Sequence, residues 1–220
     1  QEKLKTDSTA SATYKKQEGN YIDAYLNYSF NYDLRNQTYK ATDGYKALFY
    51  QELPMVSESK EIMNAFEITK YQLLPSDMVA RLGFFVKGIN TLSGNDVRVS
   101  KRLYIPESKL RGFESGKIGP IQNNDFIGGN YISTINFATT LPQLLPTFQN
   151  TDISIFVDAA NIWGVDYDST IDSNKIRSAA GIGLDLMTPI GPLSFSLSQP
   201  ISKASTDKTE TFRFNLGTTF

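Results

Sequence analysis

The chain has few residues that can perform acid–base or metal chemistry. None of its 220 residues is Cys or His, which excludes thiol nucleophiles, disulfides, zinc thiolate sites and the most common general base. The charged groups that remain are carboxylates, guanidinium groups and amines, which bind one another as ion pairs. The sequence therefore predicts a charge pair rather than an enzyme active site, and it predicts no metal and no cofactor.

The basic member of this pair is predicted to be Arg111, within Leu110-Arg111-Gly112-Phe113. This motif lies in a segment of roughly forty residues, about 91–129, that lacks the alternation seen on both sides of it. A connection of that length is usually either functional or disordered. Arg presents its donors in a fixed fork and stays charged, so a loop that folds into a confined interior needs a carboxylate for it. The alternative, which composition alone favours, is a solvated loop arginine.

The acidic member is predicted to be Asp158. In 151–159 the residues Ile153, Ile155 and Val157 share one face, so Asp158 points to the other face. If the aliphatic face meets lipid, Asp158 faces the interior of a barrel. Gly181-Ile182-Gly183 lies in a predicted strand, where small residues leave room for a group that approaches closely.

Two other patterns do not predict sites. Asp166, Asp168 and Asp172 lack the glycine and the final bidentate acid of a calcium loop, so a solvated acidic loop is expected there. The segment 112–117 is one residue short of a phosphate-binding loop, and Ile118 replaces the Ser or Thr that such a loop requires.

The elements that position these residues are predicted to be strands. Residues 21–34 alternate strictly between an apolar and a polar face over fourteen residues, whereas a typical strand has about 5–6. At the end of the chain Phe212, Phe214, Leu216 and Phe220 alternate with polar residues or Gly217. The other predicted strands are 43–53, 60–72, 77–90, 130–141, 151–159, 176–187 and 192–200, with a partial strand near 9–16.

These strands predict an all-β, antiparallel transmembrane β-barrel. No window approaches the ~18 apolar residues of a membrane helix, and the net charge of −1 argues against a nucleic-acid partner. A soluble β-sandwich also alternates, but strand length, terminal aromatic residues and loop lengths favour a barrel in a lipid bilayer. With a periplasmic C-terminus, the short turns 73–76 and 188–191 are periplasmic, and the long connections 91–129, 160–175 and 201–209 are extracellular.

Several motifs resemble, in order and spacing, those of the BamA superfamily of outer-membrane assembly proteins. They are Leu110–Phe113 with Ile118-Gly119-Pro120, Gly128-Gly129-Asn130, 156–163, 177–183, 188–193 and the terminal strand. The resemblance implies a barrel of about sixteen strands, preceded by periplasmic POTRA domains, in the bacterial outer membrane. Residues 1–220 are then expected to be the C-terminal part of that barrel, with about ten of its strands and a long loop inside the lumen.

The resemblance also implies a function and a set of roles. The function is to fold and insert β-barrel proteins through a lateral seam, with unfolded outer-membrane proteins as clients and accessory lipoproteins as partners. Leu110, Arg111, Gly112 and Phe113 brace the lumen, and Asp158 receives Arg111. A second acid usual in the family is absent, because Ala138 or Thr139 stands in its place. The terminal residues Phe212, Phe214, Leu216, Gly217 and Phe220 form the seam and the targeting signal.

Three alternatives stay open at the level of sequence. A TamA-like assembly protein or a two-partner secretion transporter belongs to the same superfamily. A passive porin-type channel belongs to a different functional class. An outer-membrane hydrolase is the least supported, because the chain has no His.

Overall fold

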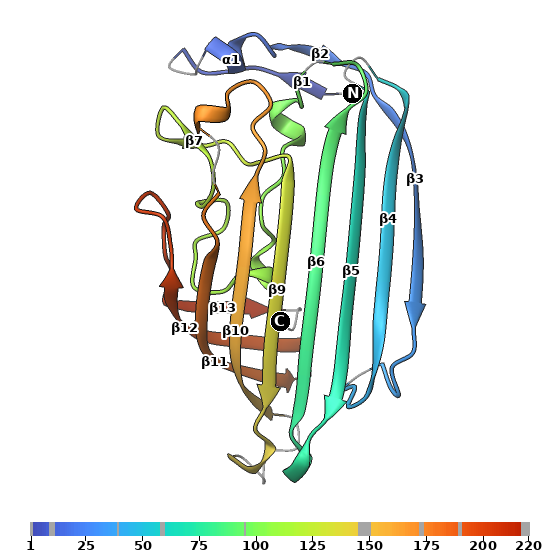
Figure 1. Cartoon of the computed structure of the whole chain (residues 1–220), viewed down its shortest axis with the longest axis vertical. Coiled ribbons are helices and arrows are strands. Elements are labelled where there is room, and N and C mark those ends of the chain that lie inside the picture. The colour runs from blue at the N-terminus through green and yellow to red at the C-terminus, as the bar shows by residue number, and fades with distance from the viewer. Residues whose placement is uncertain are drawn as a thin grey trace.

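The main element of the structure is an antiparallel sheet of nine strands, in the order β13-β12-β11-β10-β9-β6-β5-β4-β3 (Figure 1). The computed structural model describes residues 2–8, 12–38, 40–57, 60–94, 96–144, 151–171, 174–188 and 191–216. The strands of the sheet are β3 (Ala24–Asp33), β4 (Gly44–Val56), β5 (Glu61–Leu73), β6 (Val79–Thr91), β9 (Tyr131–Thr140), β10 (Thr151–Trp163), β11 (Arg177–Thr188), β12 (Gly191–Ser202) and β13 (Phe212–Leu216). The predicted all-β antiparallel fold is confirmed.

The smaller elements lie at one end of this sheet or in its turns. Two further sheets pair β1 (Glu2–Leu4) with β2 (Gly19–Tyr21) and β7 (Ile121–Gln122) with β8 (Asp125–Phe126). The helical elements are α1 (Ala12–Lys15) and the 3-10 turns η1 (Pro75–Asp77), η2 (Val99–Lys101), η3 (Glu107–Lys109), η4 (Pro142–Leu144) and η5 (Ser169–Ile171). Within the described residues, no helix is long and apolar enough to cross a membrane.

The strands are long enough to cross a bilayer. β4, β5, β6 and β10 have 13 residues each. At about 3.3 Å per residue such a strand is roughly 43 Å long, and a tilt of about 45° reduces its span to roughly 30 Å. That span equals the hydrocarbon thickness of a typical bilayer, about 30 Å.

The two faces of the sheet differ as an outer-membrane sheet requires. Large apolar side chains on its convex face are exposed, among them Leu82, Phe137, Ile155, Val157, Ile182, Leu197 and Phe214. Polar side chains on the concave face are buried, among them Thr134, Ser154, Asp158, Ser196 and Arg213. A soluble sandwich buries its apolar face, so this inverted pattern favours a lipid-facing exterior.

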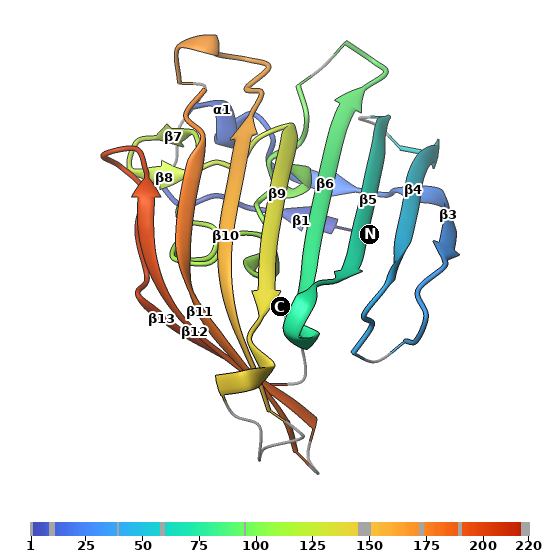
Figure 2. The same ribbon diagram turned by 60° about the horizontal axis from the view of Figure 1, so that its bottom comes forward.

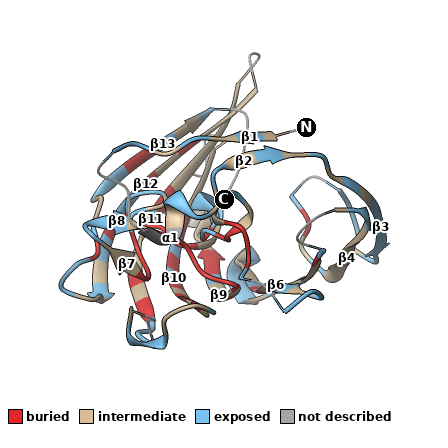
Figure 3. Ribbon diagram, turned by 90° about the horizontal axis from the view of Figure 1, so that it is seen from above, coloured by how far each residue is buried: buried red, intermediate tan, exposed pale blue. Residues whose placement is uncertain are grey.

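Seen from above, the sheet bends around the long loop (Figure 3). β3 and β13 are its two edges, and in the described chain each of them pairs with one neighbour only. The hairpin of β1 and β2, with α1, lies across the end of the sheet where the long loop enters (Figures 1 and 2). The long loop and this hairpin therefore cover part of the concave side (Figure 3).

The connections alternate between the two ends of the sheet. The long loop between β6 and β9 shares its end with the connections from β10 to β11 and from β12 to β13, while 74–78 and the junction of β11 with β12 lie at the opposite end. Two connections depart from the expected division into short and long. Segment 57–60 is short at the long-loop end, and segment 34–43 is long at the other.

Three predicted elements differ from the structure. In the segment near 9–16 the described residues form the helix α1 rather than a strand. The strand predicted at 21–34 is broken at Ile22 and Asp23, because β2 leaves the main sheet to pair with β1. The long loop has structure of its own, namely η2, η3 and the hairpin of β7 and β8. Of the predicted terminal strand, residues 217–220 lie outside the described residues.

Candidate functional site

The loop between β6 and β9 folds back onto the concave face of the sheet. Its buried apolar side chains form one cluster with apolar side chains of the strands, a cluster made of Phe85, Ile89, Val97, Leu103, Ile105, Leu110, Phe113, Ile118, Ile132, Ala160, Ile162 and Ala179. Burial of each large member contributes about 1.5–3 kcal/mol. The cluster members that belong to the loop therefore stabilise its docking by on the order of 10 kcal/mol, before the entropy of ordering the loop is subtracted. These members are Val97, Leu103, Ile105, Leu110, Phe113 and Ile118.

At the centre of the docked loop, Arg111 forms a two-point ion pair with Asp158 of β10. Its Nε and Nη2 donate to the two carboxylate oxygens at 2.7 and 2.8 Å, and its backbone N–H donates to Oδ2 at 3.1 Å. The two side chains are 3% and 0% exposed. The geometry is the bidentate fork that gives arginine–carboxylate pairs their directionality. The loop arginine is therefore buried and paired, not solvated.

The same guanidinium stacks on an aromatic ring. Arg111 Cζ lies 3.3 Å from the centroid of the Phe156 ring, which adds a cation–π attraction to the ion pair. Glycines on the next strand leave the necessary space. A Cβ atom on Gly181 would come within 2.6 Å of the Phe156 ring, and one on Gly183 would lie 2.7 Å from Ser154 Oγ.

Gly112 lets the loop cross the sheet at close range. Its φ is +85°, and a Cβ atom there would lie 2.9 Å from Cβ of Ala179 on β11 and 3.2 Å from Cβ of Ser198 on β12. Both the backbone conformation and the available space therefore require glycine. The motif needs each of its residue types: Leu110 and Phe113 for the apolar cluster, Arg111 for the pair, and Gly112 for the crossing.

Asn136 of β9 belongs to this site and was not predicted from the sequence. Its amide donates to Asp158 Oδ1 at 2.9 Å and to the Lys109 carbonyl oxygen at 2.8 Å. It therefore joins the acceptor of the pair to the loop backbone. Ala138, at the predicted place of the missing acid, lies in register with Phe156. An amide two residues earlier thus contacts the loop from the same strand, without adding a charge.

A second set of contacts binds the loop to the end of the chain. Arg213 of β13 is buried and donates Nη1 to the Glu107 carbonyl oxygen at 3.0 Å and Nη2 to the Phe113 carbonyl oxygen. Just before β13, the backbone N–H of Glu210 donates to the Gly112 carbonyl oxygen at 3.1 Å. The loop therefore contacts β10 through Arg111 and β13 through Arg213.

Another buried pair fixes the connection that leads into β13. Arg177 of β11 donates to the two carboxylate oxygens of Asp207 at 3.0 and 3.1 Å. The two side chains are 1% and 0% exposed. This pair holds 203–211 against β11, close to where the loop crosses it.

Two arginines hold the outer part of the loop. Arg102 pairs with Asp166, which also accepts the Val97 backbone N–H at 2.6 Å. Asp166 therefore has a structural role, and the expectation of a wholly solvated acidic loop is wrong at this residue. Arg98 lies 2.9 Å from Asp23 and 3.0 Å from Glu2, which ties the N-terminal hairpin to the loop. Asp172 lies outside the described residues.

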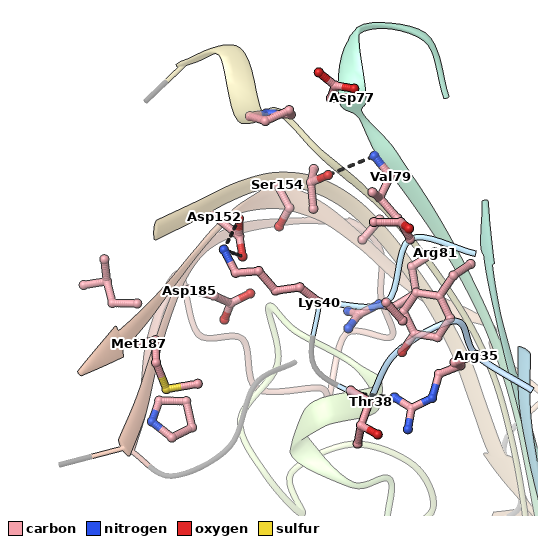
Figure 4. Close-up of a pocket in the computed structure, with 18 residues that line it drawn as sticks. Arg35, Thr38, Lys40, Asp77, Val79, Arg81, Asp152, Ser154, Asp185 and Met187 are labelled. Carbon is pink, nitrogen blue, oxygen red and sulfur yellow. Dashed lines mark hydrogen bonds and ion pairs between the residues drawn. The ribbon is translucent and has the colours of Figure 1, made fainter. Parts of the chain in front are cut away.

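A cavity of about 370 Å³ lies on the concave side, toward the end of the sheet opposite to where the loop enters, and Figure 4 shows the residues that line it. Lys40, from the connection between β3 and β4, reaches across it to Asp152 of β10, with 2.8 Å between the charged atoms. Arg81 and Asp185 also line it. Within the part of the chain that the structure describes, no three acidic side chains are placed to hold a metal ion.

The terminal residues predicted as seam and signal are described in part. Phe212, Phe214 and Leu216 of β13 point outward and are exposed, while Arg213 between them is buried. Gly217 and Phe220 lie outside the described residues. The predicted alternation therefore holds over the described part of the last strand.

Long antiparallel strands, an apolar outer face and a charged inner face around a docked loop define the class of outer-membrane β-barrel proteins. A model of the Omp85 superfamily domain matches residues 1–220. The chain belongs to the Omp85 superfamily, and the resemblance drawn from its motifs is confirmed.

Similar proteins carry one name. The chain is 29% identical over 150 residues to the outer membrane protein assembly factor BamA of Neorickettsia risticii (strain Illinois), a match that covers 66% of this chain and 20% of that protein. It is 28% identical over 139 residues to BamA of Neisseria meningitidis serogroup B (strain ATCC BAA-335 / MC58), covering 50% and 17%. These relatives place the chain among proteins of the bacterial outer membrane.

The fold has a solved counterpart. The crystal structure of BamA from Haemophilus ducreyi lacking POTRA domains 1–3 matches with a TM-score of 0.78 and 28% identity, over 86% of this chain and 41% of that one. The matches to the two BamA sequences show that the chain spans about a fifth of the length of these curated relatives.

Proposed function

We propose that residues 1–220 are the C-terminal part of the barrel of an outer-membrane assembly factor, which folds and inserts β-barrel proteins into the outer membrane. Family membership and the assembly factors among its relatives support this function. In the proposal, unfolded outer-membrane proteins are the clients, and accessory lipoproteins complete the assembly complex. The C-terminus faces the periplasm, and the loop between β6 and β9 enters from the extracellular side.

The observation that carries the proposal is the match of residues 1–220 to the Omp85 superfamily domain, together with the Arg111–Asp158 pair that docks the loop on the concave face. The described residues of β13 pair with Leu193–Leu197 of β12, and β13 and β3 are the two edges of the described sheet. Backbone groups in lipid must be paired, so a barrel normally has no edge. In the proposal β13 pairs only partly with the first strand of the complete barrel, and this seam opens. A client strand then adds to the exposed edge by β-augmentation.

The lipid beside this seam is part of the proposed mechanism. Phe212 and Phe214 point outward from the last strand and are exposed. Aromatic residues at this end and a narrowed apolar band are proposed to thin the bilayer locally, which eases the entry of a client strand. Deleting Phe220 and measuring membrane insertion of the protein tests the proposed targeting signal.

The motif residues Leu110–Phe113 are proposed to brace the lumen and so to fix the shape of the barrel beside the seam. The test is Arg111→Ala in the full-length protein, in cells that depend on it. Client assembly is expected to fall more than the amount of this protein in the membrane. A variant that assembles clients normally would contradict the role of the motif.

Two measurements separate this function from its alternatives. A passive channel is expected to conduct steadily in planar bilayers, whereas a lumen that holds a docked loop should conduct poorly. Reconstitution with an unfolded barrel protein distinguishes assembly from secretion, because an assembly factor leaves its client folded in the bilayer. A secretion transporter releases its client on the far side.

A further inference from the structure

Arg213 stands out among the residues of the last strand. It is the inward-facing neighbour of Phe212 and Phe214, and its side chain is 7% exposed. A buried guanidinium needs acceptors for its several N–H groups. Here Nε donates to Glu210 at 2.9 Å, Nη1 to the Glu107 carbonyl oxygen at 3.0 Å, and Nη2 to the Phe113 carbonyl oxygen.

The two carbonyl groups lie on either side of the loop motif. Glu107 begins η3, which precedes Leu110, and Phe113 ends the motif. One side chain of the last strand therefore binds both ends of the segment that contains Arg111. The planar fork of arginine can bind two separated carbonyl groups at once, whereas the single ammonium of lysine is a point charge.

Backbone hydrogen bonds continue this contact toward the tip of the loop. The N–H of Glu210 donates to the Gly112 carbonyl oxygen at 3.1 Å, and the N–H of Glu114 donates to the Lys208 carbonyl oxygen at 3.1 Å. The N–H of Lys208 donates to the Lys117 carbonyl oxygen at 3.0 Å. The residues that lead into β13 therefore run beside the loop.

We propose that Arg213 is a positioning residue that couples the terminal strand to the docked loop. While Arg111 is held by Asp158, the carbonyl groups of the loop hold Arg213, and β13 is fixed on two sides, by β12 and by the loop. Displacement of the loop removes the second attachment and loosens β13. The use of this coupling to control client entry rests on the proposed function, but the coupling itself needs no client.

Amide hydrogen exchange of the full-length protein in lipid bilayers tests the coupling, because local opening is read residue by residue. Arg213→Gln is expected to speed exchange at 112–117 and at 212–216 by about tenfold, the effect of losing hydrogen bonds from a charged donor. Amides in the middle of β10 and β11 should keep their rates. Lys208→Gln is the matched control, since it also replaces a cation beside the loop with an amide, but the described contacts of Lys208 are made by its backbone, so the rates should change little.

A reciprocal variant separates coupling from a local structural role. Asp158→Asn removes the charge that holds Arg111, and Asp158 has no hydrogen bond to β13 among those described. If the loop transmits the change, exchange at 212–216 rises in this variant as well. Arg213→Lys keeps the charge but loses the fork, so it should fall between the wild type and Arg213→Gln. It also serves as the test variant if Arg213→Gln does not fold.

The outcomes are distinct. Unchanged exchange at 212–216 in Arg213→Gln, or in Arg213→Lys if that variant must replace it, overturns the proposal. Faster exchange of the loop alone in Asp158→Asn also overturns it, because the displaced loop then leaves β13 fixed. Client assembly is measured separately on the same variants. Coupling without any assembly activity would count against the proposed function and leave the coupling standing.

Discussion

Replacing Arg111 with Ala should destabilise the protein more than any change at a surface ion pair. The substitution leaves a buried Asp158 carboxylate without its counter-charge, with the backbone N–H of residue 111 and the Asn136 amide as its remaining described donors. Removing one partner of a buried pair costs about 3–5 kcal/mol, because the other charge stays buried without compensation. Loss of the stack on Phe156 adds roughly 0.5–2 kcal/mol.

Two controls isolate the charge from the packing. Lys109→Ala removes a neighbouring loop cation whose pair with Glu67 is partly exposed, at 20% and 33%, and it should cost about 1 kcal/mol or less. The double variant Arg111→Met with Asp158→Leu removes both charges and keeps apolar volume. It should lose less free energy of unfolding than Arg111→Ala alone, because no unpaired charge remains.

The assay is urea unfolding of the full-length protein refolded into lipid vesicles, with the free energy of unfolding obtained by linear extrapolation. The slope against urea should stay constant among the variants, since all unfold the same barrel. If Arg111→Ala is no less stable than Lys109→Ala, the buried pair is not what holds the loop. If the double variant is the least stable of all, packing rather than charge dominates this site.

Three further predictions concern separate features. In urea unfolding, Gly112→Ala should lower the free energy of unfolding by about 2 kcal/mol or more beyond the loss in Gly116→Ala. Both residues have positive φ, but only Gly112 lacks room for a Cβ atom, so equal losses would contradict the steric argument. Phe214→Lys should reduce insertion into vesicles more than Asn215→Lys, because Phe214 points outward and a cation in lipid costs about 2–4 kcal/mol at the midplane. Equal insertion of the two variants would show that this face of the strand does not meet lipid. Hydrogen bonds from Thr6 hold the pKa of the Glu18 carboxyl below its ordinary 4.5, so their contribution is complete above that pH and is lost as the pH falls below it. Exchange at 2–8, corrected for the intrinsic rate, should then rise below pH 4.5 in the wild type but not in Glu18→Gln, which has no carboxyl group to protonate.

The sequence predicted the strands well where the two faces of the sheet differ most. Alternation marks β10 and β13 because one face of each meets an apolar exterior and the other a polar interior. Alternation could not locate the break at Ile22 and Asp23, because the pattern continues while the pairing partner changes. Near 9–16 a short run of small residues is compatible with either strand or helix, and neighbouring contacts decide between them.

The sequence predicted only part of the candidate site, because side-chain patterns mark charged residues but not their backbone partners. Arg111 was marked by its motif, and Asp158 by its place on the polar face of a strand. Asn136 and Arg213 were missed, although both stand on polar faces of predicted strands. Arg213 offered a usable signal, since a charged residue on the inner face of a last strand requires a partner. Its partners include backbone carbonyl groups of the loop, which side-chain patterns do not mark.

The contacts of Arg213 also impose an order on folding. They join residues 106 and 100 positions apart in the chain, and contacts of such separation form late because the intervening chain must first be ordered. The loop is synthesised well before β13, yet its contacts are complete only when β13 arrives. A chain that ends before Asp207 can form the contact with β10 but not those with the last strand. Full docking of the loop therefore comes only after β13 has joined the sheet.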